Sequence, residues 1–323
     1  MNCKPFLLHT LETRWSVNSV AFSPDGQSIA LGLDGGAVWL RRVLGGWYLG
    51  KLGTFSASND TFSVAFSPKG QILASGLKDS TVVLWRVADR RPQCILMGHA
   101  DSVSSVAFSP SGKILASGSR DGTVRLWRVA NGAPLYVLEE HTDWVTSVAF
   151  SYKILASGSL DGTTRLWRVA RNVHLISTLE CHPDGVTSVA FSRDGKTLAS
   201  GTIGGTVLLW RVTNSVTLLH TLEHGRPVLS VALSPDGQIL ASGTKDGIVR
   251  LWQVTSGELL HAMKRCEGWM CWVTTVAFSP DGQFLAAGLR NGRMLLWQVA
   301  DKGTPLGALM RKAWVKEQGL SAP

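Results

Sequence analysis

The sequence predicts an all-β fold, a seven-bladed β-propeller built from four-stranded antiparallel blades. A valine that precedes an Ala-Phe-Ser or Ala-Leu-Ser run recurs along the chain, with successive gaps of 44, 42, 42, 41, 42 and 45 residues. A repeat of this length is typical of propeller blades. Within each repeat, apolar residues alternate with a period of two, which indicates strands. The recurring valines are Val20, Val64, Val106, Val148, Val189, Val231 and Val276.

The third repeat shows how one blade is assembled. Val103–Phe108 is rich in β-forming residues and is followed by a Ser-Pro-Ser-Gly turn. Ile114–Ser119 is a second predicted strand, and Asp121-Gly122 forms a tight hairpin turn before a third strand at Thr123–Val129. Pro134–Leu138 supplies the fourth strand. No helical pattern interrupts the repeat, so each unit is expected to form one antiparallel sheet.

The ends of the chain predict how the ring closes. Residues 7–12 read Leu-Leu-His-Thr-Leu-Glu, identical to the fourth-strand segment at residues 218–223. We therefore expect residues 7–12 to complete the last blade, since pairing the first and last repeats removes an open sheet edge. Residues 305–310 also resemble an outer strand. The prediction is a single propeller over residues 1–303 with a C-terminal tail at 304–323.

Composition excludes some classes of protein. The 323 residues contain no apolar run near the length of a membrane-spanning helix and no N-terminal signal pattern, so we expect a cytoplasmic protein. The net charge is +9, but the arginines that follow the Leu-Trp pairs recur once per repeat and are spread around the ring. Nucleic-acid binding usually needs clustered cations with stacking aromatics. Because the arginines are not clustered, binding to nucleic acid or to another anionic surface is kept only as an alternative function.

The five cysteines do not predict a disulfide scaffold, since their number is odd and their spacing shows no paired framework. The pair Cys181-His182, and the spacing from Cys266 to Cys271, leave a metal site open as a minor alternative. However, His182 occupies a repeat position that holds histidine in three other units, which favours a structural role. The sequence predicts no metal and no cofactor.

On these repeated residues the chain resembles the WD-repeat family of β-propellers, from Leu7 to about Val299. The resemblance implies a hydrogen-bonded tetrad in which a histidine before the first strand, a serine, an aspartate in the hairpin turn and a tryptophan interact. Three blades carry all four residues. The implied tetrads are His99, Ser117, Asp121 and Trp127; His141, Ser157, Asp161 and Trp167; and His224, Ser242, Asp246 and Trp252.

A Ser–His–Asp grouping is also found in hydrolases, but three copies beside an indole are typical of a repeated structural network. The other blades depart from the tetrad, and the first blade has Thr13, Leu31, Gly35 and Arg41 at the four positions. The tetrad-poor blades 7, 1 and 2 are contiguous. We expect them to form the softest sector of the ring.

The resemblance also implies where a partner binds. The family usually uses three positions per blade on the face with the hairpin turns. Two of them flank the residue that begins the first strand, such as Val103, and the third precedes the turn aspartate. Here several of these positions hold aromatic, aliphatic or cationic residues, the types that anchor interfaces. The predicted partner-binding residues are Phe62, Lys78, Arg120, Trp144, Leu229, Lys245, Trp272 and Arg290.

These residues predict a non-enzymatic scaffold that binds a protein or peptide partner on the hairpin-turn face. An apolar patch ringed by cations favours an acidic segment with apolar anchors. An enzyme would need a singular group of carboxylates or histidines at one mouth of the channel, and the sequence shows none.

Overall fold

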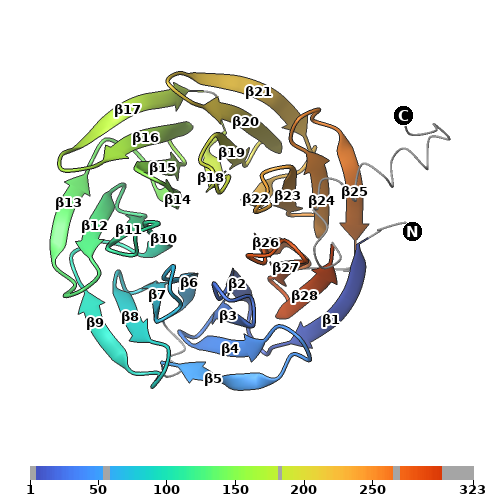
Figure 1. Cartoon of the computed structure of the whole chain (residues 1–323), viewed down its shortest axis with the longest axis horizontal. Helices are drawn as coiled ribbons and strands as arrows, with labels where there is room; N and C mark the ends of the chain where they lie inside the picture. The colour runs from blue at the N-terminus through green and yellow to red at the C-terminus, as the bar shows by residue number, and fades with distance from the viewer. Residues whose placement is uncertain (1–4, 54–58, 181–183, 265–269, 300–323) are drawn as a thin grey trace.

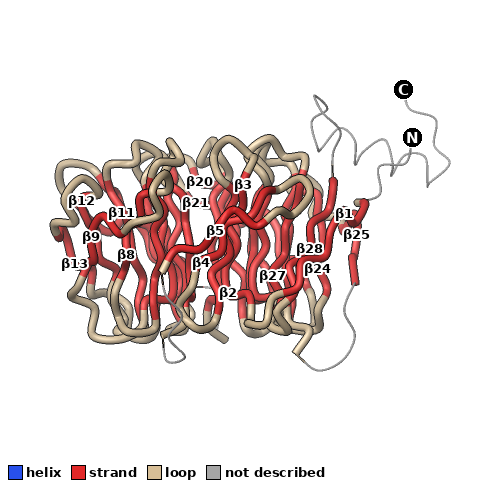
Figure 2. The backbone as a smooth tube through the Cα atoms, turned by 90° about the horizontal axis from the view of Figure 1, so that it is seen from below, coloured by secondary structure: helices blue, strands red, loops and turns tan. Residues whose placement is uncertain are grey.

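The computed structural model describes residues 5–53, 59–180, 184–264 and 270–299. Seven four-stranded antiparallel sheets are arranged around a central axis as the blades of a propeller (Figure 1). The loops gather on the two flat faces of the disc, and the strands run between them (Figure 2). The predicted fold class is therefore confirmed. Within the described ranges, no helix is long and apolar enough to cross a membrane.

The blades follow the order of the sequence, each with its first strand nearest the axis and its fourth strand at the rim (Figure 1). Blades 1 to 4 consist of β2 (Val17–Phe22), β3 (Ser28–Leu33), β4 (Val38–Arg42) and β5 (Tyr48–Leu52); β6 (Thr61–Phe66), β7 (Ile72–Leu77), β8 (Val82–Arg86) and β9 (Pro92–Leu96); β10 (Val103–Phe108), β11 (Ile114–Ser119), β12 (Val124–Arg128) and β13 (Pro134–Leu138); and β14 (Val145–Ser151), β15 (Ile154–Ser159), β16 (Thr163–Val169) and β17 (Val173–Glu180).

Blades 5 to 7 complete the ring. They consist of β18 (Val186–Phe191), β19 (Thr197–Thr202), β20 (Thr206–Val212) and β21 (Val216–Glu223); β22 (Val228–Leu233), β23 (Ile239–Thr244), β24 (Ile248–Gln253) and β25 (Leu259–Lys264); and β26 (Val273–Phe278), β27 (Phe284–Leu289), β28 (Arg293–Gln298) and β1 (Phe6–Glu12).

Closure by the N-terminal strand is confirmed. β1 pairs antiparallel with β28, with Leu7 opposite Trp297 and Glu12 opposite Arg293, and a bulge follows Leu7. β21 pairs with β20 in the corresponding register and with the bulge at the corresponding place. The identical hexapeptides of β1 and β21 therefore perform the same structural task. Residues 304–323, predicted as a tail, lie outside the described residues.

The core lies between the blades, since each sheet packs its apolar face on the next. Trp127 and Leu115 of blade 3, for example, share one buried cluster with Ala74 and Leu84 of blade 2. A glycine on each second strand permits this close approach. A Cβ on Gly118 would lie 2.6 Å from Cγ1 of Val145 in the next blade, nearer than side-chain atoms pack in protein cores.

Serines on the first strands also join the blades. The hydroxyl of Ser105 accepts a hydrogen bond from the amide of Val148 in the next blade, and Ser147 does the same for Val189, both at 3.0 Å. These bonds give the ring a polar belt near its axis, and they fix the positions from which first-strand side chains reach the hairpin-turn face.

Candidate partner-binding site on the hairpin-turn face

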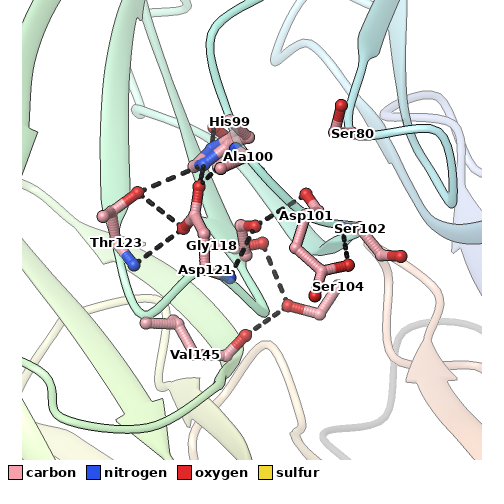
Figure 3. Close-up of polar contacts among 12 residues, drawn as sticks. Ser80, His99, Ala100, Asp101, Ser102, Ser104, Gly118, Asp121, Thr123 and Val145 are labelled. Carbon is pink, nitrogen blue, oxygen red and sulfur yellow. Dashed lines mark hydrogen bonds and ion pairs between the residues drawn. The ribbon is translucent and has the colours of Figure 1, made fainter.

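The tetrad of blade 3 holds the hairpin turn against the body of the blade. The indole of Trp127 donates to Oγ of Ser117 at 2.8 Å, and this hydroxyl lies 2.8 Å from Nε2 of His99. Nδ1 of His99 lies 2.9 Å from a carboxylate oxygen of Asp121 (Figure 3). Because the carboxylate can only accept, Nδ1 carries the proton and Nε2 accepts from the serine. All four side chains are thus joined.

Blade 4 repeats this arrangement with His141, Ser157, Asp161 and Trp167, at distances of 2.7, 2.8 and 2.9 Å. Burial alone would raise the pKa of Asp161, but hydrogen bonds from Thr163 and His141 outweigh it and lower this pKa to about 2. Burial lowers the pKa of His141. The pair is therefore a neutral imidazole bonded to a carboxylate, which is suited to holding a turn.

Blade 6 corrects one sequence expectation. His224 is bonded to Ser242 at 2.7 Å, but its Nδ1 donates to the carbonyl oxygen of Leu222 at 3.0 Å in place of the expected carboxylate of Asp246. Asp246 instead accepts from the hydroxyl of Thr244 at 2.5 Å and lies 3.6 Å from the guanidinium of Arg250. Two nearby donors compete for this carboxylate, and a backbone acceptor close to His224 replaces it.

The incomplete blades use substitute contacts. In blade 2, the side chain of Asn59 donates to Asp79 at 2.7 Å and accepts from the amide of Asp79. In blade 1, Arg41 pairs with Ile29, as Trp85 pairs with Leu73 in blade 2. Its guanidinium stacks on Trp39 and Tyr48. By sequence, the histidine position holds Ala57 in blade 2, His182 in blade 5 and Trp269 in blade 7. All three residues lie outside the described part of the chain.

The second residue of each first strand faces the axis, and five of the seven blades place a polar side chain there. The hydroxyl of Thr146 points at the carbonyl oxygens of Gly158 in its own blade and Val186 in the next, at 3.0 and 2.7 Å. Ser104 makes the corresponding bonds to Gly118 and Val145 (Figure 3). Asn18, Thr187 and Thr274 also bridge to the following blade.

Blades 2 and 6 break this rule with Phe62 and Leu229, both half-buried. An apolar side chain cannot donate the inter-blade hydrogen bond that the other five blades make, and each such bond contributes about 1 kcal/mol. These two positions therefore lack the polar bridge that the other five blades share. Both were predicted from the sequence as partner-binding residues.

Arg120 connects Phe62 with Trp144. Its guanidinium lies 4.9 Å from the ring centroid of Phe62 and 4.6 Å from that of Trp144. Trp144 comes just before β14 and keeps 42% of its surface exposed. Stacking uses the flat face of the guanidinium and leaves its N–H edge for other acceptors. Within the described part of the chain, no carboxylate forms an ion pair with Arg120.

These three residues line a cavity of about 280 Å³ on the axis side of the hairpin-turn face. Arg290 also lines it, so the cavity has two guanidinium groups, and none of its described lining residues is a carboxylate. Four of the eight predicted partner residues therefore meet in one place. The remaining lining residues are Asn18, Ser104, Val145, Thr146 and Thr274. Asn18, Ser104, Thr146 and Thr274 occupy positions where the family resemblance implies partner binding, but the predicted anchors omit them because small polar residues are weak interface anchors.

A second group of predicted residues adjoins the cavity through Arg290. The ring of Trp272 lies 4.9 Å from the guanidinium of Arg290 and 4.4 Å from Nζ of Lys245. The tryptophan is half-buried beneath these two cations. Both cations contact its ring, so Trp272 helps to position Lys245 and Arg290.

Two predicted residues lie outside this group. Lys78 forms an ion pair with Asp60 at 3.3 Å, which offsets its charge. Leu229 is half-buried and does not line the cavity. The cationic character of the site therefore comes from Arg120, Arg290 and Lys245.

Among the described residues, no group of three or more His, Cys, Asp or Glu side chains is arranged to hold a metal ion. Cys181, His182 and Cys266, which the sequence left open as ligands, lie outside those residues. Cys94 is a half-buried free thiol, and Cys271 is disulfide-bonded.

A comparison with known families agrees with this architecture. A family model described as "WD domain, G-beta repeat" matches residues 6–38, 50–86, 90–128, 132–168, 173–211, 216–253 and 259–298. Each matched segment begins in or just before the outermost strand of one blade and ends in the third strand of the next. No curated protein matches the chain.

Proposed function

Because the chain belongs to the WD40-repeat family of β-propellers, whose members typically bind proteins, we propose that it is a non-enzymatic interaction scaffold. The partner binds on the hairpin-turn face, at the cavity lined by Phe62, Arg120, Trp144 and Arg290. The observation that carries the proposal is the contact of Arg120 with two aromatic rings, in a cavity whose described lining residues include no carboxylate.

The chemistry of the cavity favours an acidic segment of a partner protein. A stacked guanidinium is held in one orientation, so it loses little side-chain entropy when it binds a carboxylate. Phe62 and the exposed edge of Trp144 offer apolar surface beside it. An acidic residue next to an apolar anchor would satisfy both features at once.

The test compares variants in their capture of partners from the source lysate. Arg120→Ala and Phe62→Thr are each immobilised beside the wild-type chain, and Tyr152→Ala serves as the matched control. Tyr152 is 79% exposed, in the turn between β14 and β15 of blade 4. We expect proteins retained by the wild type and the control to be lost from both cavity variants. Equal retention by all four chains would refute the site.

The net charge of +9 favours one second candidate, binding to nucleic acid or another polyanion. The dependence of binding on salt concentration distinguishes the two candidates. Each phosphate contact makes the affinity for a polyanion fall as salt is added, whereas a protein partner with apolar anchors stays bound at higher salt. Nuclease-sensitive material that is released at high salt would favour the second candidate. Protein retained at both salt concentrations would favour the first.

A further inference from the structure

The turn between β4 and β5 of blade 1 exposes an unusual group of apolar side chains. Leu44 is 64% exposed, Trp47 is 73% exposed, and Tyr48, the first residue of β5, is 52% exposed. Three large apolar residues within five positions form an apolar surface at the rim, away from the cavity described above. We call Leu44, Trp47 and Tyr48 the blade 1 rim patch.

The corresponding turns of the other blades are small or polar. Each of these turns lies between a valine at or just after the end of the third strand, such as Val43 or Val87, and the fourth strand. Blade 1 has Leu-Gly-Gly-Trp there. Blades 2 to 6 have Ala-Asp-Arg-Arg, Ala-Asn-Gly-Ala, Ala-Arg-Asn, Thr-Asn-Ser and Thr-Ser-Gly-Glu. The propeller therefore does not need apolar residues at this place. Their presence in one blade, exposed to solvent, points to a contact outside the ring.

The structure holds this turn in one conformation. Nη1 of Arg41 donates to the carbonyl oxygen of Gly46 at 3.1 Å, and the amide of Arg42 donates to the carbonyl oxygen of Trp47 at 2.8 Å. Gly45 and Gly46 adopt φ angles of 81° and 63°, which glycine tolerates without strain. Arg41 occupies the place of the tetrad tryptophan, so blade 1 has exchanged a structural residue for one that supports the turn.

The segment that carries the patch is basic, and one carboxylate, Asp25 of the β2–β3 turn, lines a cavity beside it with Leu49 and Arg90. Residues 35–59 contain Arg41, Arg42 and Lys51 and no aspartate or glutamate. Arg42 and Lys51 are exposed. The guanidinium of Arg90, from the next blade, lies against Gly50 of β5 and adds a further cation.

We propose that the blade 1 rim patch is a peripheral contact site for an anionic lipid bilayer. Tryptophan and tyrosine prefer the interface between headgroups and acyl chains, and nearby lysine and arginine are attracted to anionic headgroups. A single short turn covers far less area than a stable protein interface requires. Insertion into a bilayer needs no matching surface, and it draws on both the apolar and the cationic residues present here.

The test is co-sedimentation of the full chain with vesicles of phosphatidylcholine containing phosphatidylserine, and with vesicles of phosphatidylcholine alone. We expect binding to the anionic vesicles that weakens as salt is added. The double variant Leu44→Ser with Trp47→Ser should bind the anionic vesicles at least about tenfold more weakly than the wild type, since apolar burial is lost. Arg42→Gln and Lys51→Gln should each reduce binding about fivefold.

Two controls locate the effect. Tyr152→Ser removes an equally exposed aromatic residue from another blade and should bind as the wild type does. Arg120→Ala alters the cavity on the hairpin-turn face and should also leave vesicle binding unchanged, so this proposal and the proposed function can fail separately. Absence of binding to anionic vesicles, or equal binding by the Leu44→Ser, Trp47→Ser variant, would overturn the proposal. So would a protein partner whose capture depends on Trp47 while vesicles do not bind.

Discussion

The guanidinium of Arg120 lies 4.6 Å from the ring centroid of Trp144, across the boundary between blades 3 and 4. Phe62 of blade 2 lies on it as well, at 4.9 Å. One cation from a hairpin turn thus links three consecutive blades at the surface. Aromatic contact of this kind contributes about 0.5–1 kcal/mol at exposed sites, which is enough to fix the side chain but small beside the inter-blade core.

The first prediction concerns Phe62→Thr, which places at this position the residue type found in blades 4, 5 and 7. The new hydroxyl can bridge to blade 3 as Thr146 bridges to Val186. We expect the free energy of unfolding to change by less than about 1 kcal/mol, while partner capture is lost. Denaturant unfolding together with the capture assay measures both. Thr146→Phe, the reverse change, should lower stability, and a Phe62→Thr chain that keeps its partner would contradict the prediction.

The second prediction contrasts two aspartates that the sequence places in equivalent positions. Asp161 is bonded to His141, whereas Asp246 is bonded to Thr244 and lies near Arg250. Asp161→Ala leaves a buried imidazole N–H without its acceptor and should cost about 3 kcal/mol. Asp246→Ala leaves the His224 bonds in place and should cost about 1 kcal/mol. Urea unfolding measures the loss of stability in each variant. Equal losses would show that blade 6 forms the same tetrad as blade 4.

The third prediction is a two-step dependence of stability on pH. Burial lowers the pKa of His224 from 6.5 to about 4. The unfolded chain therefore binds this proton first, and stability present above pH 6.5 is lost as the pH falls toward 4, by about 3 kcal/mol for this group. The pKa of Asp161 is lowered to about 2, so its contribution is lost only below its unfolded value of 3.8.

Chemical unfolding at a series of pH values measures these steps. The variant His224→Gln should have a smaller loss between pH 6.5 and 4 and an unchanged loss below 3.8. A slope between pH 6.5 and 4 that is identical in the variant would show that another group carries it.

The sequence predicted the ring, its closure and the residues of two tetrads because these features repeat. A repeat reveals which positions the fold constrains, and it makes exceptions such as Phe62 visible. It could not predict that His224 is bonded to Leu222, since that choice depends on competition from Thr244 and Arg250 for one carboxylate. It also could not show that Lys78 is paired with Asp60 or that Arg120 is stacked, because contacts between side chains of different turns leave no periodic pattern.

The final prediction tests whether the sector around the closure is the softest part of the ring. β1 and β21 share the hexapeptide Leu-Leu-His-Thr-Leu-Glu and pair in the same register. Leu222 of β21 is 3% exposed, whereas the corresponding Leu11 of β1 is only half-buried. Identical sequences have nearly identical intrinsic rates of amide exchange, so any difference in protection reports the position in the ring.

We expect amides in β1 to exchange about tenfold faster than those in β21, since weaker burial lowers the free energy of local opening by about 1.4 kcal/mol. Hydrogen exchange with mass spectrometry, on fragments that contain residues 6–12 and 216–223, measures both strands in one sample. Blades 1 and 2, which lack complete tetrads, should also exchange faster than blades 3 and 4. Equal protection of β1 and β21 would mean that the closing strand is held as firmly as an internal one. Equal exchange in blades 1 to 4 would mean that the tetrads do not set the local stability of the ring.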